Sequence, residues 1–147
     1  MSATETDLNP NKTVGLKLPL GRDKLNDFSL TKTSLEQAQY NLKNLLQTYI
    51  GERPMQPEFG SRLRELCFEP QNDELPQKIE TEVRRAVSEW LDYIKIQEVE
   101  TLTEEGDLNQ VYVQIKYNTI LNPDTMAEIT LNATGAYQWH VQVIIRM

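Results

Sequence analysis

The sequence lacks most of the residues with which enzymes and metal proteins do their chemistry. Among 147 residues it has one cysteine, Cys67, and one histidine, His140. A single cysteine excludes an internal disulfide and any zinc site built from several thiolates. The chain also has no H-E-x-x-H, no G-x-S-x-G, no Walker loop and no glycine-rich dinucleotide loop. We therefore expect no catalytic residues, no metal and no cofactor.

The sequence also lacks an excess of basic residues and any long hydrophobic run. Lysine and arginine total 15 against 22 acidic residues, a net charge of −7. Nucleic-acid binding needs a basic stripe, so no nucleic acid is expected as a partner. No apolar run approaches the ~18–20 residues that cross a bilayer, and residues 1–11 lack the features of a secretory signal. The length predicts one domain, since domains average ~100–200 residues.

The N-terminal half is predicted to be a flexible arm followed by three helices. Residues 1–33 are polar or rich in glycine and proline, which is typical of an arm without a core of its own. A first helix is expected to start at Ser34, capped by Ser34 and Gln37, and to stop at Gly51. Its apolar residues recur at helical spacing: Leu35, Ala38, Leu42, Leu45, Leu46 and Tyr49.

Two further helices follow. A short one is expected from Ser61 to about Cys67, and a long one from an Asp73 cap to about Tyr93, with Pro76 in its first turn. One face of the long helix is apolar and is predicted to be core: Ile79, Val83, Ala86, Val87, Trp90 and Ile94. The opposite face, with Lys78, Glu82, Arg85 and Glu89, is predicted to be solvated.

From Ile96 onward the hydrophobic period changes from 3.6 to 2, which indicates strands. Three runs alternate over residues 96–102, 111–117 and 127–131, with a turn at Glu104–Asp107 and a loop at Asn122–Asp124. A last run covers residues 137–145. The sequence therefore predicts an α+β fold, in which three N-terminal helices pack on one face of a small antiparallel β-sheet formed by the C-terminal half. Residues 34–134 are expected to be the α+β domain and 135–147 a C-terminal strand extension.

The connection between the first two helices is unusually constrained. Residues 51–61 read Gly-Glu-Arg-Pro-Met-Gln-Pro-Glu-Phe-Gly-Ser, and the two prolines force the residues before them into extended conformations. Phe59 is expected to fill the core between the first and third helices. Arg53 is suited to a bidentate contact with a carboxylate, either internal or on a partner. A plain rigid connection is the alternative interpretation.

The string Gly-x-Arg-Pro-x-x-Pro-x-Phe-Gly, followed by Leu63, Leu66, Phe68 and a long amphipathic helix, resembles the baseplate wedge and sheath-initiator family of contractile phage tails. This family includes a type VI secretion baseplate subunit and was once labelled tail-lysozyme-like. The resemblance spans residues 35–131. Many members carry Glu-Pro-Arg at the end of the long helix, a segment associated with wedge docking, whereas Leu91, Asp92 and Tyr93 stand here.

The resemblance implies a structural, non-enzymatic subunit that joins the wedge complex around the hub and templates the first sheath ring. Implied partners are wedge proteins, the sheath protein, and tube or hub proteins, with no membrane. The implied location is the virion's tail baseplate, assembled in the host cytoplasm, or the particle of a contractile injection system. Wedge contacts are expected at five residues: Arg53, Pro54, Pro57, Asp92 and Tyr93.

The last run is predicted to be a sheet edge that pairs with sheath arms. It contains no proline or glycine, and an unprotected edge offers unpaired N–H and C=O groups to an incoming strand. The residues expected to meet sheath are Tyr137, Trp139, Val141, Val143 and Ile145. The alternative is that this run pairs only within its own sheet.

Two other functions stay open. One is a cell-wall-degrading glycosidase that uses Glu58 or Glu65 as the acid, since paired carboxylates serve that reaction. The other is a cytosolic regulator of the same fold that binds a signalling protein.

Overall fold

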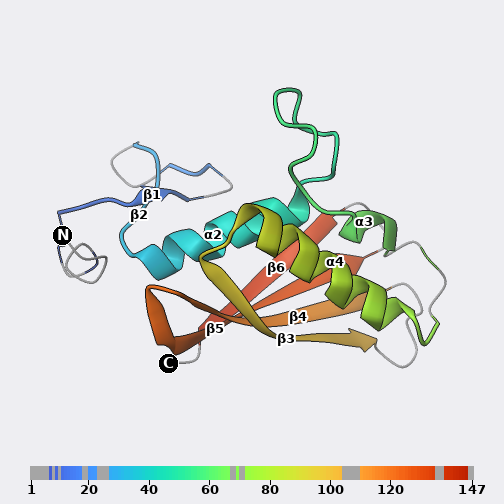
Figure 1. Cartoon of the computed structure of the whole chain (residues 1–147). Coiled ribbons are helices and arrows are strands. Elements are labelled where there is room, and N and C mark those ends of the chain that lie inside the picture. The colour runs from blue at the N-terminus through green and yellow to red at the C-terminus, as the bar shows by residue number, and fades with distance from the viewer. Residues whose placement is uncertain are drawn as a thin grey trace.

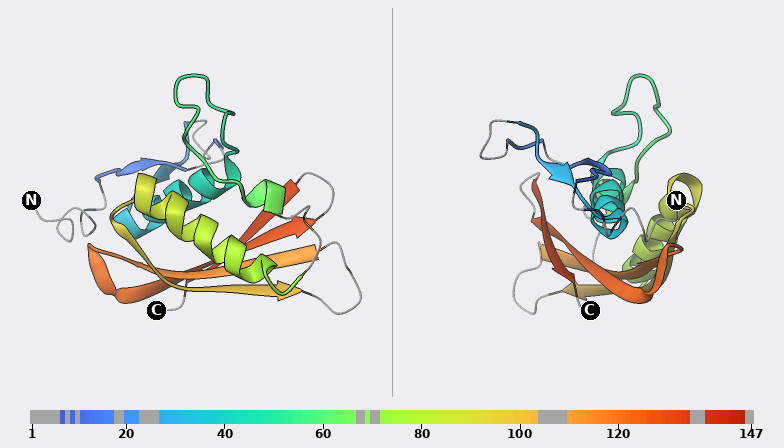
Figure 2. Two further views of the ribbon diagram at one scale, coloured as in Figure 1. Left: turned by 45° about the vertical axis from the view of Figure 1, so that its right-hand side comes forward. Right: turned by 90° about the vertical axis from the view of Figure 1, so that its left-hand side faces the viewer.

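The computed structural model describes residues 7, 9, 11–17, 20–22, 27–66, 69, 72–103, 110–134 and 138–145. It has two layers, with helices α2 and α4 lying on one face of an antiparallel sheet (Figures 1 and 2). The predicted α+β fold is confirmed. The predicted turn at Glu104–Asp107 and the predicted helix end at Cys67 lie outside the described residues.

Helix α2 covers Ser34–Gln47 and buries Ala38, Leu42, Leu45 and Leu46. Its cap is Thr33 rather than the expected Ser34, because Thr33 is extended and its side chain accepts a hydrogen bond from the Glu36 amide at 3.2 Å. The Ser34 hydroxyl is instead engaged with Asp7, to which it donates at 2.6 Å. The predicted Ser34–Gln37 capping pair is therefore wrong by one residue.

The other helices follow the predicted faces with shorter bounds. Helix α3 covers Leu63–Leu66, and α4 covers Leu75–Trp90 with Pro76 in its first turn. The cap of α4 is Glu74, not Asp73, and its side chain makes no capping hydrogen bond. The helix ends at Trp90, three residues before the expected end, where the Leu91 amide closes the last turn on the Val87 carbonyl at 2.8 Å.

The sheet contains four strands in the order β3-β4-β5-β6, each antiparallel to its neighbour. The strands are β3 (Ile94–Thr103), β4 (Gln110–Thr119), β5 (Asn122–Thr134) and β6 (Gln138–Ile145). The expected loop at Asn122–Asp124 is the first part of β5, with Asn122 paired to Thr119. The tight turn is at Ile120–Leu121, directly before the Asn122–Asp124 segment in which Pro123 predicted it.

The core lies between the sheet and the two long helices. Helix α4 contributes Ile79, Val83 and Ala86, and β4 and β5 contribute their alternate residues: Val111, Val113, Ile115, Tyr117, Ala127, Ile129 and Leu131. The opposite face of β4 carries polar residues, among them Lys116, which pairs with Glu98 of β3 at 2.7 Å. The alternation read from the sequence therefore separates the buried face from the solvated face.

Before α2, two short strands form a ribbon fastened to the start of that helix. Strand β1 (Gly15–Leu16) pairs with β2 (Leu30–Thr31), so that Leu16 stands opposite Leu30. The Thr31 hydroxyl donates to the Gln37 side chain at 2.6 Å, and Thr31 is fully buried. Part of the expected flexible arm is thus ordered against α2, while residues 1–6 lie outside the described part.

Candidate partner-binding surfaces

The loop between α2 and α3, residues 51–60, stands clear of the body of the protein (Figure 1). Its base is closed by Ser61, whose amide donates to the Thr48 carbonyl at 2.9 Å and whose hydroxyl donates to the Leu46 carbonyl at 2.8 Å. Gly60 is required at this closure. Its φ is +130°, and a Cβ there would lie 2.4 Å from the Thr48 oxygen.

Two successive turns shape the protruding loop. The Gln56 amide donates to the Arg53 carbonyl at 3.2 Å, and the Phe59 amide donates to the Gln56 carbonyl at 3.1 Å. Pro54 and Pro57 each occupy the second position of one of these turns, where the fixed φ of proline suits the turn. A third hydrogen bond, from the Gly51 amide to the Pro57 carbonyl at 2.7 Å, crosses the loop. The loop therefore has a defined shape of its own.

An aromatic stack joins the protruding loop to α4. Phe59 packs edge-on against Trp90, with ring centroids 5.2 Å apart, and it is half-buried against the core. The Arg53 guanidinium lies over the Phe59 ring, 3.8 Å from its centre. The sequence predicts Phe59 in the core between the first and third helices; the structure shows it half-buried, with a ring contact to α4. Among the described residues, the contact found for Arg53 is this cation–π contact, and a carboxylate on a partner stays a prediction.

The end of α4 is divided between core and surface. Leu91 is buried, and the Tyr93 hydroxyl accepts a hydrogen bond from the Asn41 amide group at 2.8 Å. Burial raises the pKa of Tyr93, so the phenol stays neutral at ordinary pH. Asp92 is exposed. Of the three residues at the position of Glu-Pro-Arg, Asp92 is therefore the one that offers a fully accessible side chain.

Strand β6 forms one border of the sheet. It pairs along its whole length with β5, with Val143 opposite Ile129 and Val141 opposite Leu131. In the described part of the chain β5 is its one strand neighbour, so its second side is an open edge. Ile145 and Trp139 are also in this ladder, whereas Tyr137 lies outside the described residues. Within the described residues, β6 therefore combines internal pairing with β5 and an edge that no other strand covers.

The carboxylates considered for glycoside hydrolysis do not occupy a catalytic setting. A glycosidase acid sits in an apolar pocket that keeps it protonated, but Glu58 and Glu65 are both exposed. Glu65 accepts a hydrogen bond from the Tyr49 hydroxyl. At nearby Glu82, burial raises the pKa, but hydrogen bonds from Arg85 and the Arg62 amide outweigh it and leave the pKa lowered. Among the described residues, no group of histidine, cysteine and carboxylate side chains is placed to hold a metal.

One comparison with known proteins identifies a family. The model of a family described as baseplate wedge protein gp25 matches residues 33–124. A search of curated proteins finds no match. Within the described residues, no helix has the length and apolar character needed to cross a membrane.

Three solved structures share the fold. A chain of the anti-feeding prophage baseplate is 21% identical, with a TM-score of 0.65 over 71% of this chain and 82% of that one. A chain of the contracted pyocin R2 baseplate is 22% identical, with a TM-score of 0.56 over 68% and 97%. A Geobacter sulfurreducens protein named as a tail lysozyme is 24% identical, with a TM-score of 0.62 over 69% and 91%.

Proposed function

The chain belongs to the family of baseplate wedge protein gp25, and we propose that it joins the wedge complex around the hub and templates the first sheath ring. Family membership gives it a structural role in the baseplate of a contractile phage tail or phage-like particle. The proposal adds the neighbours: wedge proteins, sheath, and tube or hub proteins, assembled in the host cytoplasm.

The open edge of β6 is the observation that carries the templating role. An edge strand presents main-chain donors and acceptors in a row, and an incoming strand satisfies them all at once. The register pairs 139, 141, 143 and 145 with 133, 131, 129 and 127 of β5. The contact proposed for sheath is therefore argued from the main chain of the free side of β6.

The wedge contact is proposed at two places that the fold leaves accessible. Pro54 and Pro57 are exposed in the protruding loop, and Asp92 is exposed after α4. Arg53 and Tyr93 support these places from within, since each already has a partner in the chain. Truncation of Arg53 is therefore expected to loosen the loop as well as to remove a charge.

The proposal assigns no enzymatic activity to the chain. The exposed carboxylates and the ion-paired outer face of α4, where Arg84 meets Glu80 at 2.8 Å, are typical of a solvated surface. A peptidoglycan clearing assay on the purified protein, with Glu58→Gln and Glu65→Gln variants, checks this. Clearing that either variant abolishes would favour the glycosidase.

Stepwise reconstitution tests the structural role. The purified chain is mixed with the wedge proteins of the same particle, and sheath subunits are added to the isolated complex. We expect the chain to enter the complex and sheath to polymerise only from complexes that contain it. Sheath that starts equally well without the chain would overturn the templating role, and failure to enter the complex would overturn the wedge role.

A further inference from the structure

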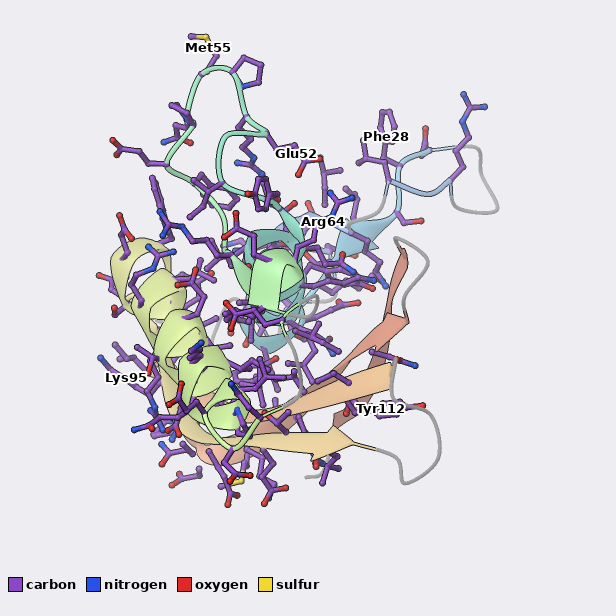
Figure 3. All side chains as sticks on the ribbon, turned by 90° about the vertical axis from the view of Figure 1, so that its right-hand side faces the viewer. Phe28, Glu52, Met55, Arg64, Lys95 and Tyr112 are labelled. Atoms are coloured by element: carbon purple, nitrogen blue, oxygen red, sulfur yellow. The ribbon has the colours of Figure 1, made fainter. Side chains whose placement is uncertain are left out.

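Met55 is exposed to a degree that no other large apolar side chain of the described residues approaches. Its exposed fraction is 94%, whereas the next most exposed, Leu20 and Phe28, reach 60%. It lies at the apex of the protruding loop and points away from the body (Figure 3). An apolar side chain held in water at the tip of a projection makes no contribution to the protein's own core.

The segment that carries Met55 is rigid rather than a slack connection. The two proline turns, the hydrogen bond from Gly51 to Pro57 and the Arg53–Phe59 stack hold its shape from within the loop. A loop that is already ordered loses little conformational entropy when it binds. The shape therefore favours insertion of the tip into a recess on another molecule.

The charges around the tip describe the recess. Glu58 is exposed on the side of the loop that follows the apex, and no ion pair of it is found among the described residues. Glu52 is also exposed but lies nearer the base, where its carboxylate accepts a hydrogen bond from the Tyr49 amide at 2.9 Å. The positive charge of Arg53 is set back against the Phe59 ring. A complementary surface thus has an apolar floor that accepts the unbranched methionine side chain and a rim of lysine or arginine.

We propose that Met55 is the anchor of the wedge contact, inserting into an apolar, basic-rimmed pocket on a neighbouring baseplate subunit. The inference rests on the proposed wedge role and names the contact through which that role is exercised. Pro54 and Pro57 then flank Met55 at the tip of the protruding loop, and Glu58 pairs with a lysine or arginine on the rim of the pocket.

Affinity for the purified wedge complex of the same particle tests the anchor. Met55→Ala is expected to weaken binding at least about tenfold, since a central anchor contributes more than ~1.4 kcal/mol, while Met55→Leu keeps most of it. Met126→Ala is the matched control, because Met126 is also exposed, at 49%, but lies in β5. All three variants are expected to have the melting temperature of the parent chain, because neither methionine is part of the core.

Three results overturn the anchor while leaving the wedge role intact. The first is an affinity of Met55→Ala within twofold of the parent's. The second is an equal loss of affinity for Met55→Ala and Met126→Ala. The third is a Met55→Lys variant that binds as tightly as the parent. If the parental chain itself does not bind the wedge complex, the wedge role fails first.

Salt dependence tests the basic rim separately. Glu58→Gln is expected to lower affinity a few-fold at low salt and to flatten its decline as salt is added, because one screened charge pair is lost. An unchanged salt slope, or tighter binding by Glu58→Gln, would contradict a basic rim.

Discussion

The two edges of the sheet are built in opposite ways. The outer edge of β3 is closed by a bulge between Ile96 and Glu98 and by α4, from which the Arg84 guanidinium donates to the Ile96 carbonyl at 3.2 Å. Its residues include the charges Lys95, Glu98 and Glu100. The edge of β6, read Gln-Trp-His-Val-Gln-Val-Ile-Ile, has no formal charge, no proline and no bulge in its ladder with β5.

This contrast shows that the residues of each edge strand, and not the fold as a whole, determine whether that edge is protected. Bulges, edge charges and covering side chains are the means by which proteins prevent strand addition. The same sheet uses all three on one side and none in the described part of the other. On the proposed templating role, strand addition from another molecule would be confined to β6.

The largest effect is expected from proline substitution in β6, because it removes a main-chain donor from the open edge. Successive residues of an antiparallel strand direct their N–H groups to alternate sides, so one of Gln142 and Val143 donates inward and the other outward. We expect the proline that removes the outward donor to leave the fold intact and to lower sheath initiation at least about tenfold. The proline that removes the inward donor should melt the edge strand itself.

Thermal melting and sheath polymerisation are measured for Gln142→Pro and Val143→Pro together. If both variants fold and both start sheath normally, β6 is not the templating edge. If both unfold, the test moves to neighbouring positions of the same strand, where the same alternation holds.

A smaller effect is expected when the protected edge is opened. Arg84→Ala removes the donor to the Ile96 carbonyl and the ion pair with Glu80, and the pair is exposed, so the stability loss should stay below about 1 kcal/mol. Glu80→Gln is the matched control, because it breaks the ion pair but keeps Arg84. Sedimentation should show concentration-dependent association for Arg84→Ala alone. Association of neither variant would show that the bulge and charges close this edge without Arg84.

Periodicity explains why so much of this fold is predictable from the sequence. Helix α4 and strand β4 each repeat their apolar residues at the spacing of the element, so their buried faces follow directly. The errors come from contacts distant in sequence. Ser34 was expected to cap α2, but Asp7, 27 residues earlier, engages its amide and hydroxyl.

The candidate surfaces were predicted in part for the same reason. The stiffness of residues 51–60 follows from the prolines and glycines, but the direction of the loop depends on how Phe59 meets Trp90, which has no local signal. The contact of Arg53 with the Phe59 ring has no local signal either, because the ring must first be placed by the turn that ends the loop. The docking roles of Pro54, Pro57 and Asp92, and the division of the chain at residues 34 and 135, stay predictions.

The smallest expected effect concerns the ion pair that ties β3 to β4 beside the protected edge. Lys116 donates to Glu98 at 2.7 Å, which lowers the pKa of Glu98 below its ordinary 4.5 and raises the pKa of Lys116 above 10.5. The contribution of Glu98 is complete above about pH 4.5 and is lost as pH falls through the lowered value. The contribution of Lys116 is complete below about pH 10.5 and is lost as pH rises through the raised value.

Between these limits the pair should therefore stabilise the β3–β4 ladder by a constant amount. Glu98 is exposed and Lys116 only half-buried, so the difference in melting temperature between the parent and Glu98→Gln should be small and should shrink in high salt. We expect that difference to be flat from about pH 6 to about pH 9 and to vanish as pH falls through the lowered pKa of Glu98. A difference that grows on acidification would mean that Glu98 is not stabilised as the carboxylate. The order on the closed side of the sheet would then rest on the bulge and on Arg84 instead of on this pair.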